Sequence, residues 1–301
     1  MSDWQIQKSL DNRDETSLGY MLKLAAPMIV TNISFTMMQF IDRLMVSCLG
    51  TNELAAVLPA GVVSFLPGSF AIGVLTSVNT FVSQSYGRRE NEQCPKYCWQ
   101  GIYMGLAYFM VVTAIMWQWS DVIFKAMGHE GVIIEMEVSY LRIMLYTQII
   151  SIFMHASSQF FMGVHRPIIT MYAAIAAQVV NVGCNYVLIF GHFGFPQLGI
   201  RGAAWGTFIG MAVETCIHMW MFIGSDINEK FHTRSGLKPD LIIMKDLLKV
   251  GMPAGFGLMI NISLWAMILL GLVSRFGKEA LAATSAVFSC INISVMPIVG
   301  I

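Results

Sequence analysis

PMIVTNISFTMMQFIDRLMVSCLGTNELAA, residues 27–56, decides the fold of this chain. It is a long apolar run that ends in a short turn at Gly50, and a single carboxylate, Asp42, lies inside it. Apolar residues continue after Asp42, so a helix places this acid about two turns before its end. A charge at that depth in a membrane helix costs about 2.5–3.5 kcal/mol on insertion scales, which makes Asp42 a candidate functional residue.

Apolar runs of this kind recur along the whole chain of 301 residues, which is 56% hydrophobic, 12% charged and has a mean hydropathy of +0.64. Soluble proteins carry about 25% charged residues. A bilayer core of about 30 Å needs about 20 apolar residues per helix. We therefore predict an all-α, polytopic transmembrane bundle with eight spans, at residues 20–48, 54–86, 97–119, 133–162, 167–191, 201–224, 247–274 and 280–301.

The distribution of Lys and Arg predicts the orientation of these spans. With the N-terminus in the cytoplasm, twelve of them lie on the cytoplasmic side, five lie on the opposite side, and Arg142 lies within the fourth span. Cytoplasmic loops of membrane proteins are enriched in Lys and Arg. We therefore expect a multi-pass protein of the inner or plasma membrane with a cytoplasmic N-terminus. Its net charge of zero gives no basic field for nucleic acid, so membrane lipid is expected as a partner and nucleic acid is not.

A sequence repeat indicates two lobes. LGTNELAAV at 49–57 aligns with FGKEALAAT at 276–284, an offset of 227 residues, and the two segments share Gly, Leu, Ala and Ala. Six predicted spans separate the copies, so both copies enter the membrane in the same direction, as in parallel transporter repeats. We predict a six-helix lobe at 1–224, a cytoplasmic linker at 225–246 and the start of a second lobe at 247–301. The second copy stops within its second span, so the chain is predicted to be a fragment.

Several motifs, in this order and spacing, resemble those of the multidrug and toxic compound extrusion (MATE) transporters. They are FIDRLMVSCLGTNELAAV (40–57), FVSQSYGRREN (81–91), NVGCNYVLIFG (181–191) with LGIRGAAWGT (198–207), and GMPAGFGLMIN (251–261). The resemblance covers the chain from about residue 17 to its end. It implies a twelve-helix, non-enzymatic, monomeric exporter of organic, often cationic or amphipathic compounds. Such a protein works by alternating access in exchange for Na⁺ or H⁺ and needs no cofactor beyond that ion.

The resemblance places the ion-coupling site around Asp42, with Asn181, Asn185 and Thr207. Asn181 and Asn185 are four residues apart, so their amides lie on one helical face. Amide, hydroxyl and carboxylate oxygens are hard donors that suit Na⁺ or a hydrogen-bonded proton. Some family members have Asp at the position of Asn185. Others have an acid in the seventh helix near Asn261, whereas this chain has no Asp or Glu between Asp246 and Glu279. Coupling is therefore predicted to rest on Asp42.

Each of these residues also has an ordinary structural explanation. Asp42 could be a water-exposed acid paired with Arg43 near a helix end. The two asparagines could form interhelical hydrogen bonds, and Thr207 could be a small packing residue.

Three further residues are candidates for the substrate cavity: Gln39, Glu214 and Trp265. Glu214 could attract a cationic substrate, or it could pair with His218 one turn later on the same helix. The chain also has 23 Met residues and 12% aromatics, a composition that suits a pliable cavity for amphipathic compounds.

Two other functions compete with drug export. A flippase for lipid-linked oligosaccharides or lipid precursors needs cations for a pyrophosphate group, and the first-lobe spans hold few, mainly Arg142. An intramembrane enzyme needs a catalytic constellation such as H-E-x-x-H, and the six histidines are dispersed. A remnant without transport activity is a third alternative.

Overall fold

The protein is a bundle of long helices in a computed structural model that describes residues 18–129 and 131–268. No strand is present in these ranges. Six long helices lie in the segment predicted to form the first lobe: α2 (Leu18–Ser47), α3 (Thr51–Gly87), α4 (Cys94–Ala126), α5 (Val132–Gly163), α6 (Pro167–Phe190) and α7 (Ile200–Ile223). Their bounds confirm the first six predicted spans to within a few residues, except for the last turns of α4.

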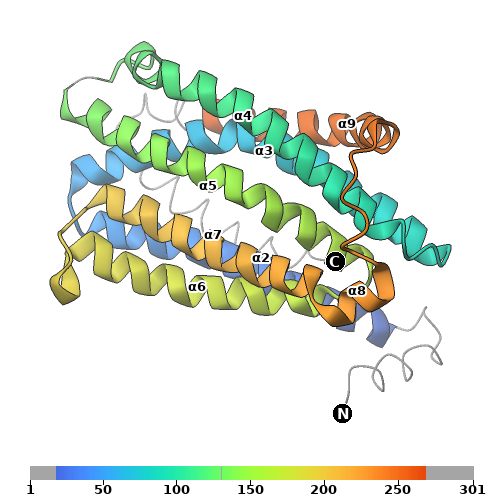
Figure 1. Ribbon diagram of the computed structural model, residues 1–301. Coiled ribbons are helices and arrows are strands. Elements are labelled where there is room, and N and C mark those ends of the chain that lie inside the picture. Colours follow the sequence, from blue (N-terminus) through green and yellow to red (C-terminus); the bar gives the residue numbers. More distant parts are fainter. Residues whose placement is uncertain (1–17, 130, 269–301) are drawn as a thin grey trace.

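The six helices lie side by side, with α3 and α4 at one side, α2 and α6 at the other, and α5 and α7 between them (Figure 1). Helices are the expected solution in lipid, because each satisfies its own backbone hydrogen bonds. Five helices in the described part of the chain are long and apolar enough to cross a membrane by length and composition. The protein is therefore a multi-pass membrane protein.

Buried hydroxyl groups in α3 are satisfied within the helix itself. Ser64, Ser69 and Ser77 are all buried, and each hydroxyl donates to the carbonyl oxygen three residues earlier at 2.7–2.8 Å. Such back-bonding keeps a polar side chain compatible with an apolar interior. α3 has 37 residues and continues through Pro59 and Pro67. At 1.5 Å per residue it is about 55 Å long, so it extends beyond the bilayer core.

The turn between α6 and α7 depends on glycine at both of its ends. Gly191 ends α6 with a φ of 76°, and a Cβ there would lie 2.9 Å from the backbone nitrogen of Gln197. Gly199 precedes α7 with a φ of 55°. Both conformations favour residues without a Cβ. The turn fixes α6 and α7 as an antiparallel pair, which sets the level at which their side chains meet.

The linker between the lobes is attached to α4. The Trp99 indole donates to the Thr233 carbonyl at 2.8 Å, and the fully buried Gln100 amide donates to the Lys238 carbonyl at 3.0 Å. Gln100 also accepts from the backbone N–H of Asp240 at 3.0 Å. The linker contains a short helix, α8 (Ser225–Phe231), which the sequence analysis did not predict.

The next long helix, α9 (Leu241–Ala266), which is the predicted start of a second lobe, begins six residues before its predicted span. The side chain of Asp240 caps it by accepting from the backbone N–H groups of Ile242 and Ile243. Hydropathy detects only the apolar part of a helix, whereas this helix begins at its polar cap. The predicted eighth span and the repeat segment at 276–284 lie outside the described residues.

Glycines allow α9 to approach α3 closely. A Cβ added to Gly73 would lie 2.6 Å from the Gly255 Cα, and one added to Gly251 would lie 2.5 Å from the Val74 carbonyl oxygen. Small residues with this spacing let membrane helices pack backbone to backbone. α3 and α9 therefore meet along a seam in which no side chains separate the two backbones at the closest points.

Candidate functional site

The acid in the opening stretch lies where three helices meet. Asp42 is five residues before the end of α2, Asn185 is five before the end of α6, and Thr207 is seven after the start of α7. Asn181 and Asn185 are fully buried, and Thr207 is 6% exposed. The structure thus brings together the four residues predicted for ion coupling, although they span 165 positions of sequence.

Hydrogen bonds connect these four side chains directly. The Asn185 amide nitrogen donates to Asp42 Oδ1 at 2.5 Å and to Asn181 Oδ1 at 3.2 Å. The Thr207 hydroxyl lies 3.3 Å from Asp42 Oδ2 and 3.0 Å from the Ala203 carbonyl oxygen. Both oxygens of the carboxylate therefore have a partner on a different helix. Asp42 is partly buried and is held by side chains of α6 and α7, whereas the alternative explanation required a water-exposed acid.

The Thr207 hydroxyl gives the site two hydrogen-bonding states. A hydroxyl carries one proton and two acceptor lone pairs. When Asp42 is ionised, Thr207 can donate to Oδ2. When Asp42 is protonated, the carboxylic acid can donate to Thr207 while Thr207 donates to Ala203. The same geometry can therefore hold a carboxylate or a carboxylic acid without leaving the carboxyl unpaired.

A sodium ion also fits the chemistry of these donors. The Asp42 carboxylate, the Asn181 amide oxygen and the Thr207 hydroxyl are hard oxygen ligands. Asn185 presents its nitrogen to Asp42, while its Oδ1 is buried without a hydrogen-bond partner. Turning this amide by 180° would add a further oxygen on the side of Asp42, and the two amide orientations have nearly the same shape.

Glycines of α7 make room for the asparagines of α6. A Cβ added to Gly206 would lie 1.9 Å from Asn185 Oδ1, and one added to Gly210 would lie 2.9 Å from the Asn181 Cβ. A Cβ on Gly202, one turn before, would lie 2.5 Å from the Leu188 carbonyl oxygen. The three glycines, four residues apart, therefore form one face of α7, and the two asparagines of the candidate site pack against this face.

Sequence reasoning missed the role of these glycines. The signal is visible as a Gly at every fourth position in IRGAAWGTFIG.

The structure distributes the three residues predicted for the substrate cavity over three helices. Gln39 is partly buried on α2, Glu214 is partly buried on α7, and Trp265 is 42% exposed near the end of α9. Glu214 and His218 are not paired, because neither ring nitrogen of His218 has a hydrogen-bond partner. A shared role of the three residues stays a prediction.

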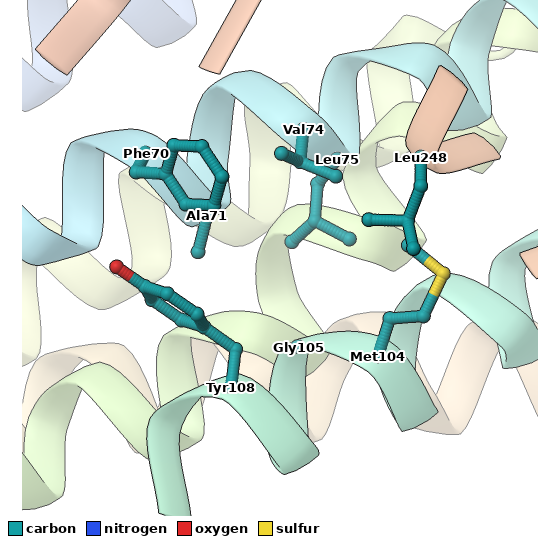
Figure 2. Close-up of a pocket in the computed structure, with 8 residues that line it drawn as sticks. All are labelled: Phe70, Ala71, Val74, Leu75, Met104, Gly105, Tyr108 and Leu248. Carbon is teal, nitrogen blue, oxygen red and sulfur yellow. The ribbon is translucent and has the colours of Figure 1, made fainter. Parts of the chain in front are cut away.

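A separate apolar cavity lies between α3, α4 and α9 (Figure 2). It contains about 330 Å³ of space, part of it open to the surroundings. The Tyr108 hydroxyl donates to the Pro67 carbonyl at 3.1 Å, so its polar group is already paired. None of the predicted site residues lines the cavity, whose walls are Phe70, Ala71, Val74, Leu75, Met104, Gly105, Tyr108 and Leu248.

Comparison with known proteins identifies the family. The MatE family model matches residues 27–187, more than half of the chain, and this segment includes Asp42, Asn181 and Asn185. The chain belongs to the MATE family. MATE proteins are transporters, so the fold is that of a membrane transporter and the resemblance found in the motifs is confirmed.

Solved structures show the same fold. The protein is similar to a MATE protein in complex with MaL6 (24% identity, TM-score 0.79) and to an outward-facing multidrug resistance MATE family transporter of the MOP superfamily (24%, 0.80). It is also similar to a MOP superfamily transporter from Pyrococcus furiosus whose reversed pocket polarity suggests a different function (24%, 0.76). In each case 93% of this chain is covered, and the chain spans 61% of the length of the solved structure.

Proposed function

We propose that this MATE protein is a secondary antiporter that exports organic, cationic or amphipathic compounds in exchange for Na⁺ or H⁺. The observation that carries this proposal is the contact of Asp42 with Asn185 and Thr207 across three helices. An ionised carboxylate in a membrane helix is costly, and a bound cation removes that cost. Ion binding therefore changes the stability of the arrangement of α2, α6 and α7.

Ion binding is coupled to transport if the arrangement of α2, α6 and α7 differs in stability between the inward-open and outward-open states of the transporter. A ligand shifts a conformational equilibrium only by its difference in affinity for the two states. With the ion bound, Asp42 is neutral and its partners can stay together. Without the ion, the carboxylate favours the state in which water reaches it. Export of a compound and entry of an ion are thus linked through one side chain.

The location of Arg142 supports drug export over lipid-precursor flipping. Its guanidinium lies 5.0 Å from the centre of the Trp117 ring and 3.6 Å from Asp121, both on α4. It also donates to the Ser120 hydroxyl at 3.4 Å. Arg142, the main cation within the first six spans, is therefore engaged in contacts with α4 and is not available to bind a pyrophosphate group.

The test is efflux of a fluorescent cationic dye from cells that express the complete gene, with the Na⁺ and pH gradients imposed separately. We expect Asp42→Asn to abolish gradient-driven export at unchanged expression. Asp121→Asn is the matched control, because Asp121 is an exposed acid outside the site, and it should export normally. Normal export by Asp42→Asn would refute the coupling site, and absence of dye export by the unmodified protein under both gradients would favour the flippase.

The proposal includes the setting of the protein. We place it in the inner or plasma membrane as a monomer, with the cytoplasmic N-terminus that the distribution of Lys and Arg predicts. On this orientation the Asp42 site lies toward the outer surface, where α2 and α6 end and α7 begins.

A further inference from the structure

The walls of the cavity between α3, α4 and α9 suit an alkyl chain (Figure 2). Among its eight lining residues, all in the described part of the chain, Tyr108 is the one with a polar side chain, and its hydroxyl already donates to the Pro67 carbonyl. None of the eight is an acid that could attract a cationic compound. Apolar cavities of this kind offer water no hydrogen bonds and stay dry. The walls can therefore bind an apolar ligand and little else.

The cavity follows α3 and α4 lengthwise and is closed by aromatic rings at one end. The Phe70 ring lies 5.4 Å from the Tyr108 ring and 5.1 Å from the Phe256 ring, centre to centre. Met104 and Leu248 lie at the other end (Figure 2). Met104 and Tyr108 are four residues apart, about 6 Å along α4. The space therefore suits part of one alkyl chain that lies parallel to the helices.

The level of the cavity is that of the acyl chains of a bilayer. Met104 is ten residues after the start of α4, and Leu248 is seven after the start of α9, so both lie about 10–15 Å from the helix starts. Both helices begin next to polar segments, which places this depth within an apolar core of about 30 Å. Part of the cavity is open to the surroundings. An empty space there would forfeit dispersion contacts that an acyl chain can make.

Two lysines lie above the open end of the cavity. Lys245 is three residues before Leu248, so it lies on the same side of α9 and nearer to the helix start. Lys238 is held close to α4, because the Tyr103 hydroxyl donates to the carbonyl of the residue before it at 2.6 Å, and Tyr103 is next to Met104. Both lysines are exposed, and within the described ranges neither has an ion-pair partner. Their charges are therefore available to an anion.

The acids of the same stretch do not neutralise this pair of lysines. The Asp240 carboxylate is used to cap α9, where it accepts from two backbone N–H groups. Asp246 is two residues before Leu248 and therefore does not face the same side of α9. Lys249, one turn after Lys245, adds a further positive charge. Basic groups between transmembrane helices near the cytoplasmic surface are typical binding sites for anionic lipid headgroups.

We propose that the cavity between α3, α4 and α9 binds one acyl chain of an anionic phospholipid, whose headgroup phosphate is held by Lys238 and Lys245. The walls hold the chain by van der Waals contact. A chain that leaves the bilayer for the cavity exchanges one apolar environment for another, so the choice among lipids comes from the two charges. Lipid binding here is independent of the proposed export, so it is tested without transport.

The first experiment locates the lipid by photochemical attachment. The complete gene product is placed in nanodiscs of phosphatidylcholine with a small share of phosphatidylglycerol that carries a diazirine in one acyl chain, and peptide mass spectrometry maps the attached residues. We expect attachment at Met104, Tyr108 or Leu248. Unlabelled phosphatidylglycerol should displace the probe at a concentration about tenfold or more below that of phosphatidylcholine, because two lysines contribute to its binding.

Three results of this experiment would overturn the site. Equal displacement by the two lipids, or attachment spread evenly over exposed positions of α4 such as Met110, would show ordinary contact with the bilayer. Absence of attachment in the cavity would show that another part of the complete protein fills it. Displacement by a cationic dye but not by phosphatidylglycerol would assign the cavity to a transported compound.

A variant that fills the cavity tests the position of the acyl chain. Ala71 points from α3 toward α4 in Figure 2, and Ala71→Leu places a larger side chain in the space. Ala107→Leu is the matched control, because Ala107 is exposed on α4 outside the cavity. We expect Ala71→Leu to abolish attachment in the cavity and Ala107→Leu to leave it unchanged, at similar melting temperatures. Unchanged attachment in folded Ala71→Leu refutes the chain site.

A second pair of variants tests the headgroup and does not touch the protein interior. Lys238→Gln/Lys245→Gln should remove the preference, so that both lipids displace the probe at the same concentration. Lys125→Gln/Arg201→Gln removes two exposed cations at the other end of the bundle and should keep the preference. A preference that survives the loss of Lys238 and Lys245 refutes the proposal, and it does so even if Ala71→Leu fails to fold.

Discussion

Gly206→Ala tests whether the approach of α7 to α6 builds the ion site. The new Cβ would lie 1.9 Å from Asn185 Oδ1 and 2.8 Å from the Asn185 Cγ. Non-bonded carbon and oxygen atoms cannot remain this close, so the Asn185 side chain has to move. The same amide donates to Asp42 Oδ1, so its displacement removes that hydrogen bond.

The effect on the fold should be small and the effect on the site large. Overpacking of an interior costs about 1–3 kcal/mol, and replacing a helical Gly by Ala returns about 0.5–1 kcal/mol. A hydrogen bond to a charged group contributes about 1.5–3 kcal/mol. Since 1.4 kcal/mol is a factor of ten in affinity, the apparent affinity for the coupling ion should fall by about tenfold or more.

Gly183→Ala is the matched control. Gly183 lies on α6 between the two asparagines, and a Cβ there would have nothing within 4 Å. Dye export is measured in proteoliposomes over a series of coupling-ion concentrations, together with the melting temperature of each purified variant. We expect Gly206→Ala to raise the half-saturating ion concentration about tenfold, with little change in melting temperature, and we expect Gly183→Ala to match the unmodified protein.

Two results would refute this reasoning. If Gly206→Ala and Gly183→Ala have the same ion dependence, Asn185 does not support Asp42 in the working protein. If both variants lose export, the glycines of this helix pair act through general packing, and the contact at Gly206 has no special part.

Three further predictions concern single contacts. Thr207→Val should weaken coupling-ion affinity about tenfold because it removes the hydroxyl next to Asp42, whereas Thr207→Ser should retain it; ion-dependent export measures both. Gly251→Ala should lower stability by about 1–3 kcal/mol because its Cβ would meet a backbone carbonyl of α3. Gly257→Ala, with nothing within 4 Å, should not, and equal melting temperatures would contradict the seam. His129→Ala should cost about 1–3 kcal/mol because it leaves the buried Glu137 carboxylate without its 2.7 Å partner; thermal unfolding tests this, with export of the surviving protein unchanged.

The sequence predicts the helical bundle well because a membrane-spanning helix is recognised from the apolar composition of its own segment. A span needs about 20 apolar residues whatever its neighbours are, so a window of sequence is enough to find it. The start of α9 is different, since it depends on the cap provided by Asp240. α8 was missed because five of its seven residues are polar and the segment is too short to show a periodic pattern.

The sequence predicted which residues form the candidate ion site, but it did not predict how the helices pack to bring them together. The spacing of Asn181 and Asn185 indicates a shared face, and the family resemblance adds Asp42 and Thr207. Nothing in the spacing tells which helix faces this surface or how close it comes. The close approach of α7 to α6 depends on glycines such as Gly206. Their role can be recognised only when the helix that packs against them is known.

The attachment of the segment before α9 to α4 limits how α9 can move. Gln100 binds the chain at the α9 cap residue and two residues before it, at the N–H of Asp240 and the carbonyl of Lys238. The first turn of α9 therefore stays at a fixed point on the first lobe while these bonds last. α9 can swing or bend beyond that point, for which Pro253 offers a break in the helical hydrogen bonds, but it cannot slide along the bundle. α9 can therefore rotate about its fixed first turn. A rotation of a few degrees displaces the far end of this 26-residue helix by several ångströms.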